Sequence, residues 1–182
     1  MSEFLYSSDP HLNHEFVAQW RKFSSVKAMN ECLMDNYSQV LSPKKTLVLL
    51  GDIAFGDKDE AYRLLKKLQG KKILIAGNHD NKKIMSWDIW SEVTLYKEMK
   101  DEGKSLSIFH FPIEDWSGKH RGVIHLHGHE HGALPDYVNR IDVGVDNLKW
   151  EFKPVSIEQI LEQTRHLPKH PECGHHKYEC NK

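Results

Sequence analysis

The sequence has 182 residues, and its 25 Lys and Arg nearly balance its 26 Asp and Glu. This balance argues against an obligate electrostatic binder of duplex DNA, although a nucleotide substrate remains possible. The length favours one domain with a substantial core, and thirteen histidines are the main oddity of the composition.

No membrane segment or secretory signal is visible in the sequence. The longest apolar runs reach about half of a membrane span, and the N-terminus lacks a basic segment followed by a long apolar stretch. The three cysteines, Cys32, Cys173 and Cys180, do not make a disulfide framework. We therefore expect a cytoplasmic protein in a reducing environment.

The first half of the sequence alternates apolar runs with amphipathic segments. The expected elements are a strand over 3–8, a helix over 24–41, a strand over 46–50, a helix over 57–69 and a strand over 72–76. The runs 46–50 and 72–76 are apolar almost throughout, which is typical of strands covered on both faces. This order predicts an α/β fold.

The second half is richer in short strands. After a short helix over 81–90, we expect strands over 93–96, 106–109, 123–127 and 140–143, forming a second, antiparallel or mixed set. A last helix over 156–165 begins with Ser156 and Gln159, the pattern of a capping box. We place the domain at 1–165 and expect the polar tail, 166–182, to be poorly ordered unless something ties it down.

The segment 123–131 begins as an apolar run and ends in histidines at every second position. If the strand persisted, His127, His129 and His131 would face one way. Imidazole is the commonest protein ligand of transition metals, so this pattern indicates a metal site. The alternative is a polar edge strand that is rich in histidine.

Polar side chains of the kind that bind metals follow several of the expected strands. Loops at the carboxyl ends of strands form the functional crevice of α/β sheets. Seven groups of this kind are too many for one ion but suit two, with one carboxylate shared between them. They are Asp9, His11, Asp52, Asn78, His110, His129 and His131.

At these positions the sequence resembles the calcineurin-like metallophosphoesterases. The motifs, in order, are Asp9-x-His11, Gly51-Asp52, Gly77-Asn78-His79-Asp80, His110 and Gly128-His129-x-His131. Each motif alone is weak, but five in order are specific, and the resemblance covers residues 4–160. Small bacterial and phage members are the most similar, because they share the stretches 51–55 and 140–146.

The resemblance implies a four-layer αββα sandwich, in which two mixed β-sheets are flanked by helices. It also implies two divalent cations, one held by Asp9, His11 and His131 and the other by Asn78, His110 and His129, with Asp52 between them. A hydroxide bridging the cations would attack phosphorus in line. His79 would donate a proton or hydrogen bond to the phosphate or leaving group. Manganese is the favoured metal, and Fe, Zn, Ni or Mg could occupy the same ligands.

The sequence departs from some family phosphatases just after Gly51-Asp52. Those enzymes carry an Asp and an Arg there, whereas this chain has Ile53, Ala54 and Phe55. The carboxylate that pairs with the catalytic histidine is therefore missing, and we assign that role to Asp80. Phe55 offers an apolar wall near the metals.

Contacts to substrate and to the ligating histidines are open at this point. Asn78, His14, His120, Arg121 and Arg140 are candidates for contacts to phosphate, each with a surface, packing or supporting role as the alternative. Asp142, Asp146 and backbone carbonyls are equally suited to accept from the ligating imidazoles. Trp87, Trp90 and Trp116 could stack on a base or an aryl leaving group, but packing in the core or in a lid is favoured. His125 and His127 are expected to be packed residues that support the site, with a role as metal ligands as the alternative.

The tail carries Cys173, His175, His176 and Cys180 within one short segment. These residue types could hold a structural zinc, and the two cysteines could form a bridge. An unstructured tail is the alternative. The family resemblance does not cover this segment.

The favoured function is a dinuclear phosphodiesterase, because a small domain without a cap insertion leaves an open groove that suits diesters. Its partner would be a small phosphoester, such as a cyclic nucleotide, a nucleotide or a nucleic-acid end. A phosphomonoesterase or broad-specificity phosphatase is the alternative within the class. A non-catalytic interaction module on the same fold is the alternative from another class. The oligomeric state does not follow from the sequence.

Overall fold

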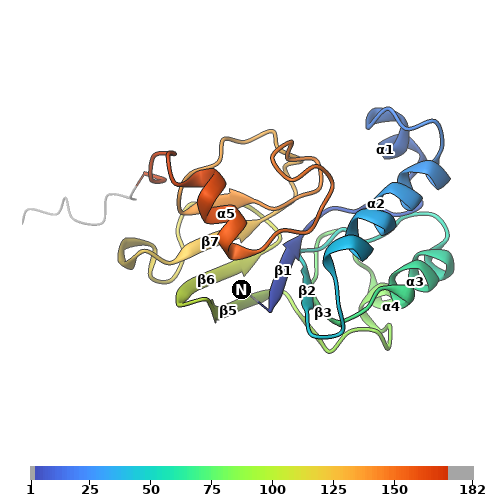
Figure 1. Ribbon diagram of the computed structural model, residues 1–182, viewed down its shortest axis with the longest axis horizontal. Coiled ribbons are helices and arrows are strands. Elements are labelled where there is room, and N and C mark those ends of the chain that lie inside the picture. Colours follow the sequence, from blue (N-terminus) through green and yellow to red (C-terminus); the bar gives the residue numbers. More distant parts are fainter. Residues whose placement is uncertain (1–2, 172–182) are drawn as a thin grey trace, which may run out of the picture.

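The computed structural model describes residues 3–171 and contains two four-stranded sheets with an apolar core between them (Figure 1). The predicted α/β class, with two sheets flanked by helices, is confirmed. Among residues 3–171, no helix is long and apolar enough to cross a membrane.

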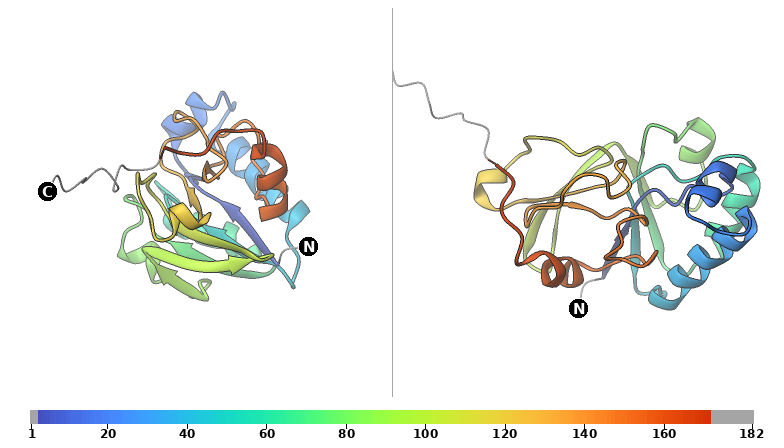
Figure 2. Two further views of the ribbon diagram at one scale, coloured as in Figure 1. Left: turned by 90° about the vertical axis from the view of Figure 1, so that its left-hand side faces the viewer. Right: turned by 90° about the horizontal axis from the view of Figure 1, so that it is seen from above.

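The first sheet is entirely parallel and is built from the N-terminal half of the chain. Its strands lie in the order β1 (Phe4–Ser7), β2 (Thr46–Leu49), β3 (Lys71–Ile75) and β4 (Glu92–Thr94). The connecting helices are α1 (Glu15–Trp20), α2 (Val26–Val40), α3 (Lys58–Lys67) and α4 (Lys82–Met85). These helices gather on the outer side of the sheet (Figure 2), where their apolar faces pack against Leu47, Leu49 and Leu74.

The second sheet is mixed, as expected. Its strands lie in the order β5 (Tyr96–Asp101), β6 (Lys104–Phe109), β7 (Ile124–His127) and β8 (Arg140–Asp142). β5 pairs antiparallel with β6, and the other pairs are parallel.

One sequence prediction about the sheets was wrong. The segment 93–96 was expected in the second set, but Val93 and Thr94 pair with β3 in the first sheet, and Tyr96 already begins β5. A strand's residues do not specify which sheet it joins, because pairing depends on the neighbouring strand rather than on local pattern.

The core between the sheets is formed by alternate side chains of both sheets. Tyr6, Val48 and Ile75 meet Ile108 and Leu126 across it. Ile157 and Ile160 of helix α5 (Ile157–Thr164) join this core, and the helix lies against β1. The predicted capping box is confirmed, because Ser156 and Gln159 bond to each other's backbone N–H groups.

Packing continues beyond the expected domain boundary at residue 165. The N–H of Val138 donates to the carbonyl of Pro168 at 3.0 Å, and the N–H of His170 donates to Asn139 Oδ1 at 2.7 Å. His170 is buried. The segment 166–171 is therefore part of the folded unit. The cysteine and histidine residues of the tail, from 173 to 180, lie outside the described residues.

Candidate metal centre

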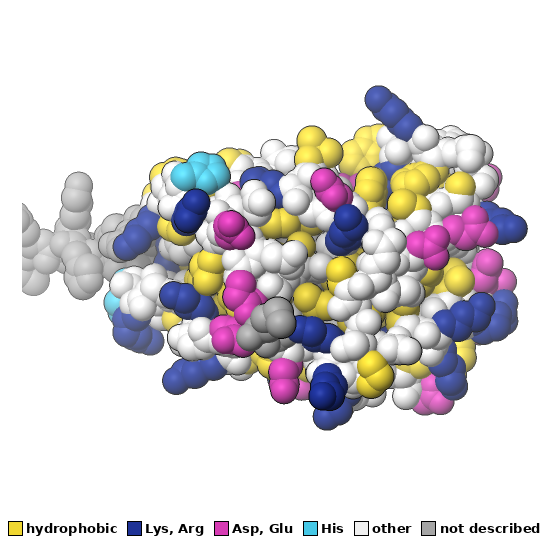
Figure 3. Space-filling view, in the orientation of Figure 1, with side chains coloured by type: hydrophobic (Ala, Val, Ile, Leu, Met, Phe, Trp, Pro, Cys, Tyr) yellow, Lys and Arg dark blue, Asp and Glu magenta, His cyan; other side chains and the backbone are white. Residues whose placement is uncertain are grey.

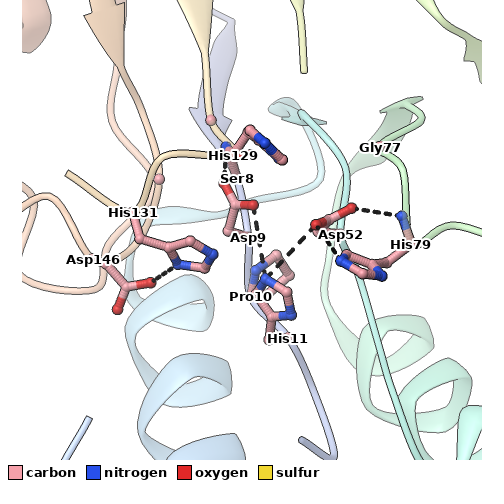
Figure 4. A network of polar contacts seen from close by, with 12 residues as sticks. Ser8, Asp9, Pro10, His11, Asp52, Gly77, His79, His129, His131 and Asp146 are labelled. Atoms are coloured by element: carbon pink, nitrogen blue, oxygen red, sulfur yellow. Dashed lines mark hydrogen bonds and ion pairs between the residues drawn. The ribbon is translucent and has the colours of Figure 1, made fainter. Parts of the chain in front are cut away.

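Loops that follow five strands meet at one end of the two sheets (Figure 4). The strand β1 leads into Asp9 and His11, β2 into Asp52, β3 into Asn78 and His79, β6 into His110, and β7 into His129 and His131. Backbone hydrogen bonds join neighbouring loops: Asp9 N–H donates to Gly51 O, His11 N–H to Asp52 O, and Gly128 N–H to His110 O. These bonds hold distant parts of the sequence together at one site.

Five of the seven candidate ligands adopt a left-handed backbone. Their φ values are +55° for Asp9, +49° for His11, +54° for Asp52, +70° for His129 and +50° for His131. Such values are uncommon outside glycine, and strained backbone is concentrated at functional sites. The left-handed turns aim side chains inward that a regular strand could not bring together.

The strand that would place His127, His129 and His131 on one face does not persist through these residues. The strand β7 ends at His127, and the two later histidines lie in the left-handed turns that follow. His127 is buried, and its Nδ1 donates to Gly128 O at 2.9 Å. Its ring stacks on that of His125, with centroids 5.4 Å apart, so His127 has a packing role.

Gly128 allows the β7 loop to approach the β1 loop closely. A Cβ at this position would collide with Ser8 Oγ and Asp9 Oδ2. The N–H of His129 donates to the same Asp9 oxygen at 2.9 Å. Only glycine leaves room for this contact.

The first ligand group consists of Asp9, His11 and His131, whose potential ligand atoms all lie within 4.8 Å of one another. Asp9 Oδ1 and both ring nitrogens of His11 are buried without a hydrogen-bond partner among the described residues. Unpartnered buried polar atoms are costly. A cation beside Asp9 Oδ1 would satisfy this atom and one ring nitrogen of His11, so the donor set fits a metal.

The second ligand group consists of Asp52, His110 and His129, with the same close spacing. Asn78 Oδ1 lies 2.9 Å from His110 Nε2, so the amide joins this group. His110 Nδ1 lies 2.6 Å from Leu50 O, which favours the tautomer with a proton on Nδ1. That tautomer leaves Nε2 free to act as a ligand.

Asp52 belongs to the second group and also reaches toward the first. Its Oδ1 is 3.5 Å from His110 Nε2 of the second group, and its Oδ2 is 3.9 Å from His11 Nε2 of the first. One carboxylate oxygen therefore faces each group. This is the arrangement that a shared ligand of two cations requires.

Arg21 supports the first group, although no sequence motif indicates this role. His131 Nδ1 donates to Asp146 at 2.7 Å, and Arg21 donates to both oxygens of Asp146. Arg21 also donates to the carbonyls of Asp9 and Pro10 at 2.8 and 2.9 Å. Arg21 follows the end of α1 and has no motif around it, so only its tertiary position reveals this role.

The two acidic residues left open as partners of the ligating histidines have different contacts. Asp146 accepts from His131. Asp142 accepts from the N–H groups of Gly132 and Gly144 at 2.9 and 2.6 Å and so holds the loop that follows His131.

Asp80 does not orient the His79 imidazole, which corrects the role assigned to it from the sequence. Its two oxygens accept from the backbone N–H groups of Asp52, Ile53 and Gly77 at 2.9 to 3.0 Å. Both oxygens are committed to these bonds. Asp80 therefore fixes the loop that carries Asp52 against the loop that carries Asn78.

His79 lies at the solvent-exposed edge of the centre. Its N–H donates to Asp52 Oδ1 at 3.0 Å, its Nε2 lies 3.9 Å from Asp52 Oδ2, and 48% of its side chain is exposed. The imidazole is therefore accessible to a molecule that enters from solvent.

Burial disfavours the charged forms of Asp9 and His11. It raises the pKa of Asp9 to about 8 and lowers the pKa of His11 to about 2. The hydrogen bond to Asp146 raises the pKa of His131 above its usual range. A divalent cation would reverse the effect of burial on Asp9, because it favours the ionised carboxylate.

Two aromatic side chains line the centre near His79. His11 stacks on Phe55 with ring centroids 5.3 Å apart, and Phe55 lies 4.8 Å from the ring of His79. His14 caps α1 and lies 4.1 Å from Phe55. Phe55 thus forms the apolar wall that the sequence predicted, and His14 stands beside it.

The structure separates three expected phosphate contacts from the centre. His120 and Arg121 lie in the short turn η1 (Lys119–Arg121), which precedes β7, whereas the metal ligands follow that strand. Arg140 begins β8, is buried, and contacts Glu114 at 3.4 Å. All three lie at the amino ends of strands in the second sheet, whereas the candidate ligands follow the carboxyl ends.

The three tryptophans considered as substrate contacts have packing roles. Trp87 belongs to the core of the first sheet, and the half-buried Trp90 stacks on it. Trp116 is buried against His125, which also packs in the second sheet.

A two-sheet α/β fold with two adjoining ligand groups at its strand ends defines a class of protein with a two-metal centre. The family comparison is specific: the model of the calcineurin-like phosphoesterases matches residues 3–181. The chain belongs to this family and is a metal-dependent phosphoesterase that acts on small phosphoesters.

Two curated proteins are similar over most of the chain. An uncharacterized protein of Methanocaldococcus jannaschii is 28% identical and covers 88% of this chain and 90% of its own length. The Gene 66 protein of Mycobacterium phage L5 is 28% identical, with 97% and 100% covered.

Two solved structures are also similar. A protein of unknown function from Aquifex aeolicus has a TM-score of 0.68 and 26% identity, with 88% of this chain and 98% of that one covered. The phosphoesterase Yfce from E. coli has a TM-score of 0.53 and 16% identity, covers 80% and 79%, and supports the fold alone.

Proposed function

We propose that the protein is a phosphodiesterase whose centre holds two divalent cations, with manganese as the favoured metal. The observation that carries the proposal is the placement of Asp52, whose two oxygens face the two ligand groups. Imidazole, carboxylate and amide donors together suit borderline divalent metals, including Fe, Zn and Ni as well as Mn.

When bound, the two cations would offset phosphate charge and lower the pKa of a water molecule near neutrality. Asp9, His11 and His131 would hold the first cation, and Asn78, His110 and His129 the second. Asp52 would contribute to both. Arg21 would keep the first group in place through Asp146 and through the carbonyls beside Asp9.

His79 is the residue we assign to the leaving group. Its exposed imidazole stands at the rim of the centre, and its backbone is tied to Asp52. It would donate a proton or a hydrogen bond to the departing oxygen. Asn78 is exposed beside it and could also reach a phosphate oxygen. Phe55 and His14 would limit the approach of substrate from one side.

The charge around the centre supports diesters over monoesters. A monoester carries a second negative charge that a further cationic side chain would have to offset. Arg21 is committed to Asp146 and two carbonyls, and Arg121 and Arg140 lie elsewhere. A singly charged diester fits this setting better. A phosphomonoesterase or broad-specificity phosphatase is the second candidate, favoured by the open position of His79.

The test is hydrolysis of bis(p-nitrophenyl) phosphate, with p-nitrophenyl phosphate as the matched monoester. The protein is stripped with EDTA and then reloaded with Mn²⁺, Fe²⁺, Zn²⁺, Ni²⁺ or Mg²⁺ in turn. We expect no turnover after stripping, recovery with Mn²⁺, and a higher kcat/KM for the diester. A higher kcat/KM for the monoester would contradict the preference. The absence of turnover in every metal state would leave a non-catalytic module on this fold.

A further inference from the structure

A cavity of about 620 Å³ opens directly beside the first ligand group. His131, Arg21 and Asp146 line it, together with the apolar side chains of Trp20, Leu148 and Phe152. Ligand sites of this size hold small organic molecules, and their walls are mainly apolar with a few polar groups. His131 lines the cavity and also belongs to the first ligand group, so the cavity adjoins the candidate metal centre.

Trp20 is an exposed aromatic side chain that contacts the first ligand group. Its ring meets the His131 ring edge to face, with centroids 5.7 Å apart. Trp20 is 53% exposed and Leu148 is 93% exposed. Hydrophobic side chains gather on the face of the molecule that carries α1, at the upper right of Figure 3. Large apolar groups left in solvent beside a polar centre are typical of a binding site.

The backbone around this cavity is held in the same strained conformation as the ligand loops. Lys22, Glu151 and Phe152 have φ values of +62°, +50° and +60°, and His131 has +50°. Four cavity-lining residues other than glycine are thus left-handed. The cost of such conformations is commonly offset at functional sites, where they place groups that a relaxed backbone would not.

We propose that this cavity binds the aromatic ring of a nucleotide-type phosphoester whose phosphate lies at the metal centre, with the base stacked on Trp20. The proposal rests on the proposed function and adds the substrate class to it. A planar base can stack on the exposed ring of Trp20. Stacking of a base on an aromatic side chain contributes substantially to affinity, whichever base is bound. Lys22 and Glu151 at the rim offer one donor and one acceptor for polar edges of the ring.

The test measures binding rather than turnover. Isothermal titration calorimetry on Mn-loaded protein compares the methylene phosphonate analogues of AMP and of ribose 5-phosphate, which keep the phosphate charge and resist hydrolysis at that bond. We expect the AMP analogue to bind at least about tenfold more tightly. Trp20→Ala should remove most of this preference and leave the affinity for the ribose analogue within about twofold.

Two further variants serve as controls. Trp20→Phe keeps an aromatic face and should stay within about threefold of the parent protein for the AMP analogue. Phe16→Ala removes an exposed aromatic ring from the same helix but outside the cavity, and it should change neither affinity. Leu148→Ala changes an exposed residue of the cavity wall. It should weaken the binding of the AMP analogue and leave the binding of the ribose analogue unchanged.

Equal affinity of the parent protein for the two analogues would overturn the proposal, as would an unchanged preference in Trp20→Ala. Diester hydrolysis, measured separately, distinguishes this failure from that of the proposed function. Turnover without a Trp20-dependent preference would exclude the base site and support the phosphodiesterase activity. A Trp20-dependent preference without turnover would support the base site and exclude the enzyme activity.

Discussion

Arg21 and Asp146 lie 125 positions apart in the sequence and form a two-bond ion pair, with Nε–Oδ1 and Nη2–Oδ2 distances of 2.7 and 2.6 Å. Asp146 also accepts from His131, and Arg21 also donates to the carbonyl of Asp9. The pair therefore supports two ligands of the first group at once. Both side chains are largely buried, so the pair is shielded from solvent.

Replacing Arg21 should weaken the binding of the first cation more than the binding of the second. Arg21→Lys keeps the charge but cannot form the two-bond fork to Asp146. Loss of a group that orients ligands typically reduces metal affinity about 10- to 100-fold. Metal titration followed by calorimetry should therefore show one weakened site and one retained site. Arg63→Lys on the exposed face of α3 is the matched control, and equal weakening in both variants would refute the role of Arg21.

Asp52→Asn should weaken both cations together. The amide keeps one oxygen but replaces the second with a nitrogen that cannot ligate a cation, and it removes the negative charge between the two groups. Inductively coupled plasma analysis after dialysis should find less than one tightly held ion per chain. Retention of two tightly bound ions in this variant would exclude a shared ligand.

His79→Ala should retain both cations and lose most of the rate. General acid catalysis contributes roughly 10²- to 10⁴-fold, so kcat should fall by a factor in that range for a diester with an alkoxide leaving group, such as a dinucleotide. Because His79 acts on the leaving group, the loss should shrink for a substrate whose leaving group needs no protonation, such as a p-nitrophenyl ester. A loss of metal as large as that of Asp52→Asn would contradict this assignment.

The buried His125 should make stability fall as the pH falls. Burial lowers its pKa to about 3, whereas an unfolded histidine has a pKa of about 6.5. The unfolded state therefore binds more protons below pH 6.5, and stability decreases from there toward pH 3. Between pH 7 and pH 5, protonation of this histidine in the unfolded state alone should lower the free energy of unfolding by about 2 kcal/mol. Urea unfolding of metal-free protein should show a smaller drop over this range in His125→Gln, and an equal drop would refute the assignment.

Removing residues 168–182 should destabilise the protein more than removing residues 172–182. The two truncations differ only in 168–171, which bond to Val138, Asn139 and Lys119. Loss of these contacts and of the buried His170 should lower the free energy of unfolding by about 1–3 kcal/mol. Thermal unfolding of the two chains measures the difference. Equal melting temperatures would show that these contacts contribute nothing.

The local patterns of the chain predicted most of the fold. Continuous apolar runs specified β2 and β3, and the 3.6-residue periodicity specified α2 and α3. Two features of the structure differ from the sequence prediction: the sheet that one strand joins, and a helix that was not expected. Glu92–Thr94 joined the first sheet, and α1 formed in a segment without an expected element. Neither depends on local periodicity, since the first is set by the partner strand and the second by the cap at His14.

The candidate ligands could be found in the sequence because each follows a strand, and strand ends in such a sheet share one edge. Their supporting partners could not. Arg21 is remote from every motif, and Asp80 adjoins His79 in the sequence but bonds to the backbone of Asp52 and Ile53. His120 and Arg140 have suitable chemistry, but His120 precedes β7 and Arg140 begins β8, whereas the candidate ligands follow strands.

The sequence by itself determined the residue types at the strand ends and the family to which the chain belongs, because those depend on order and local pattern. Only the tertiary structure decided which of these side chains face each other and which exposed ring stands beside them. The physical reason is that the left-handed turns at His11, Asp52 and His131 redirect side chains through angles that no local periodicity encodes. Trp20 acquires its position next to His131 in the same way, through packing between segments more than 100 residues apart.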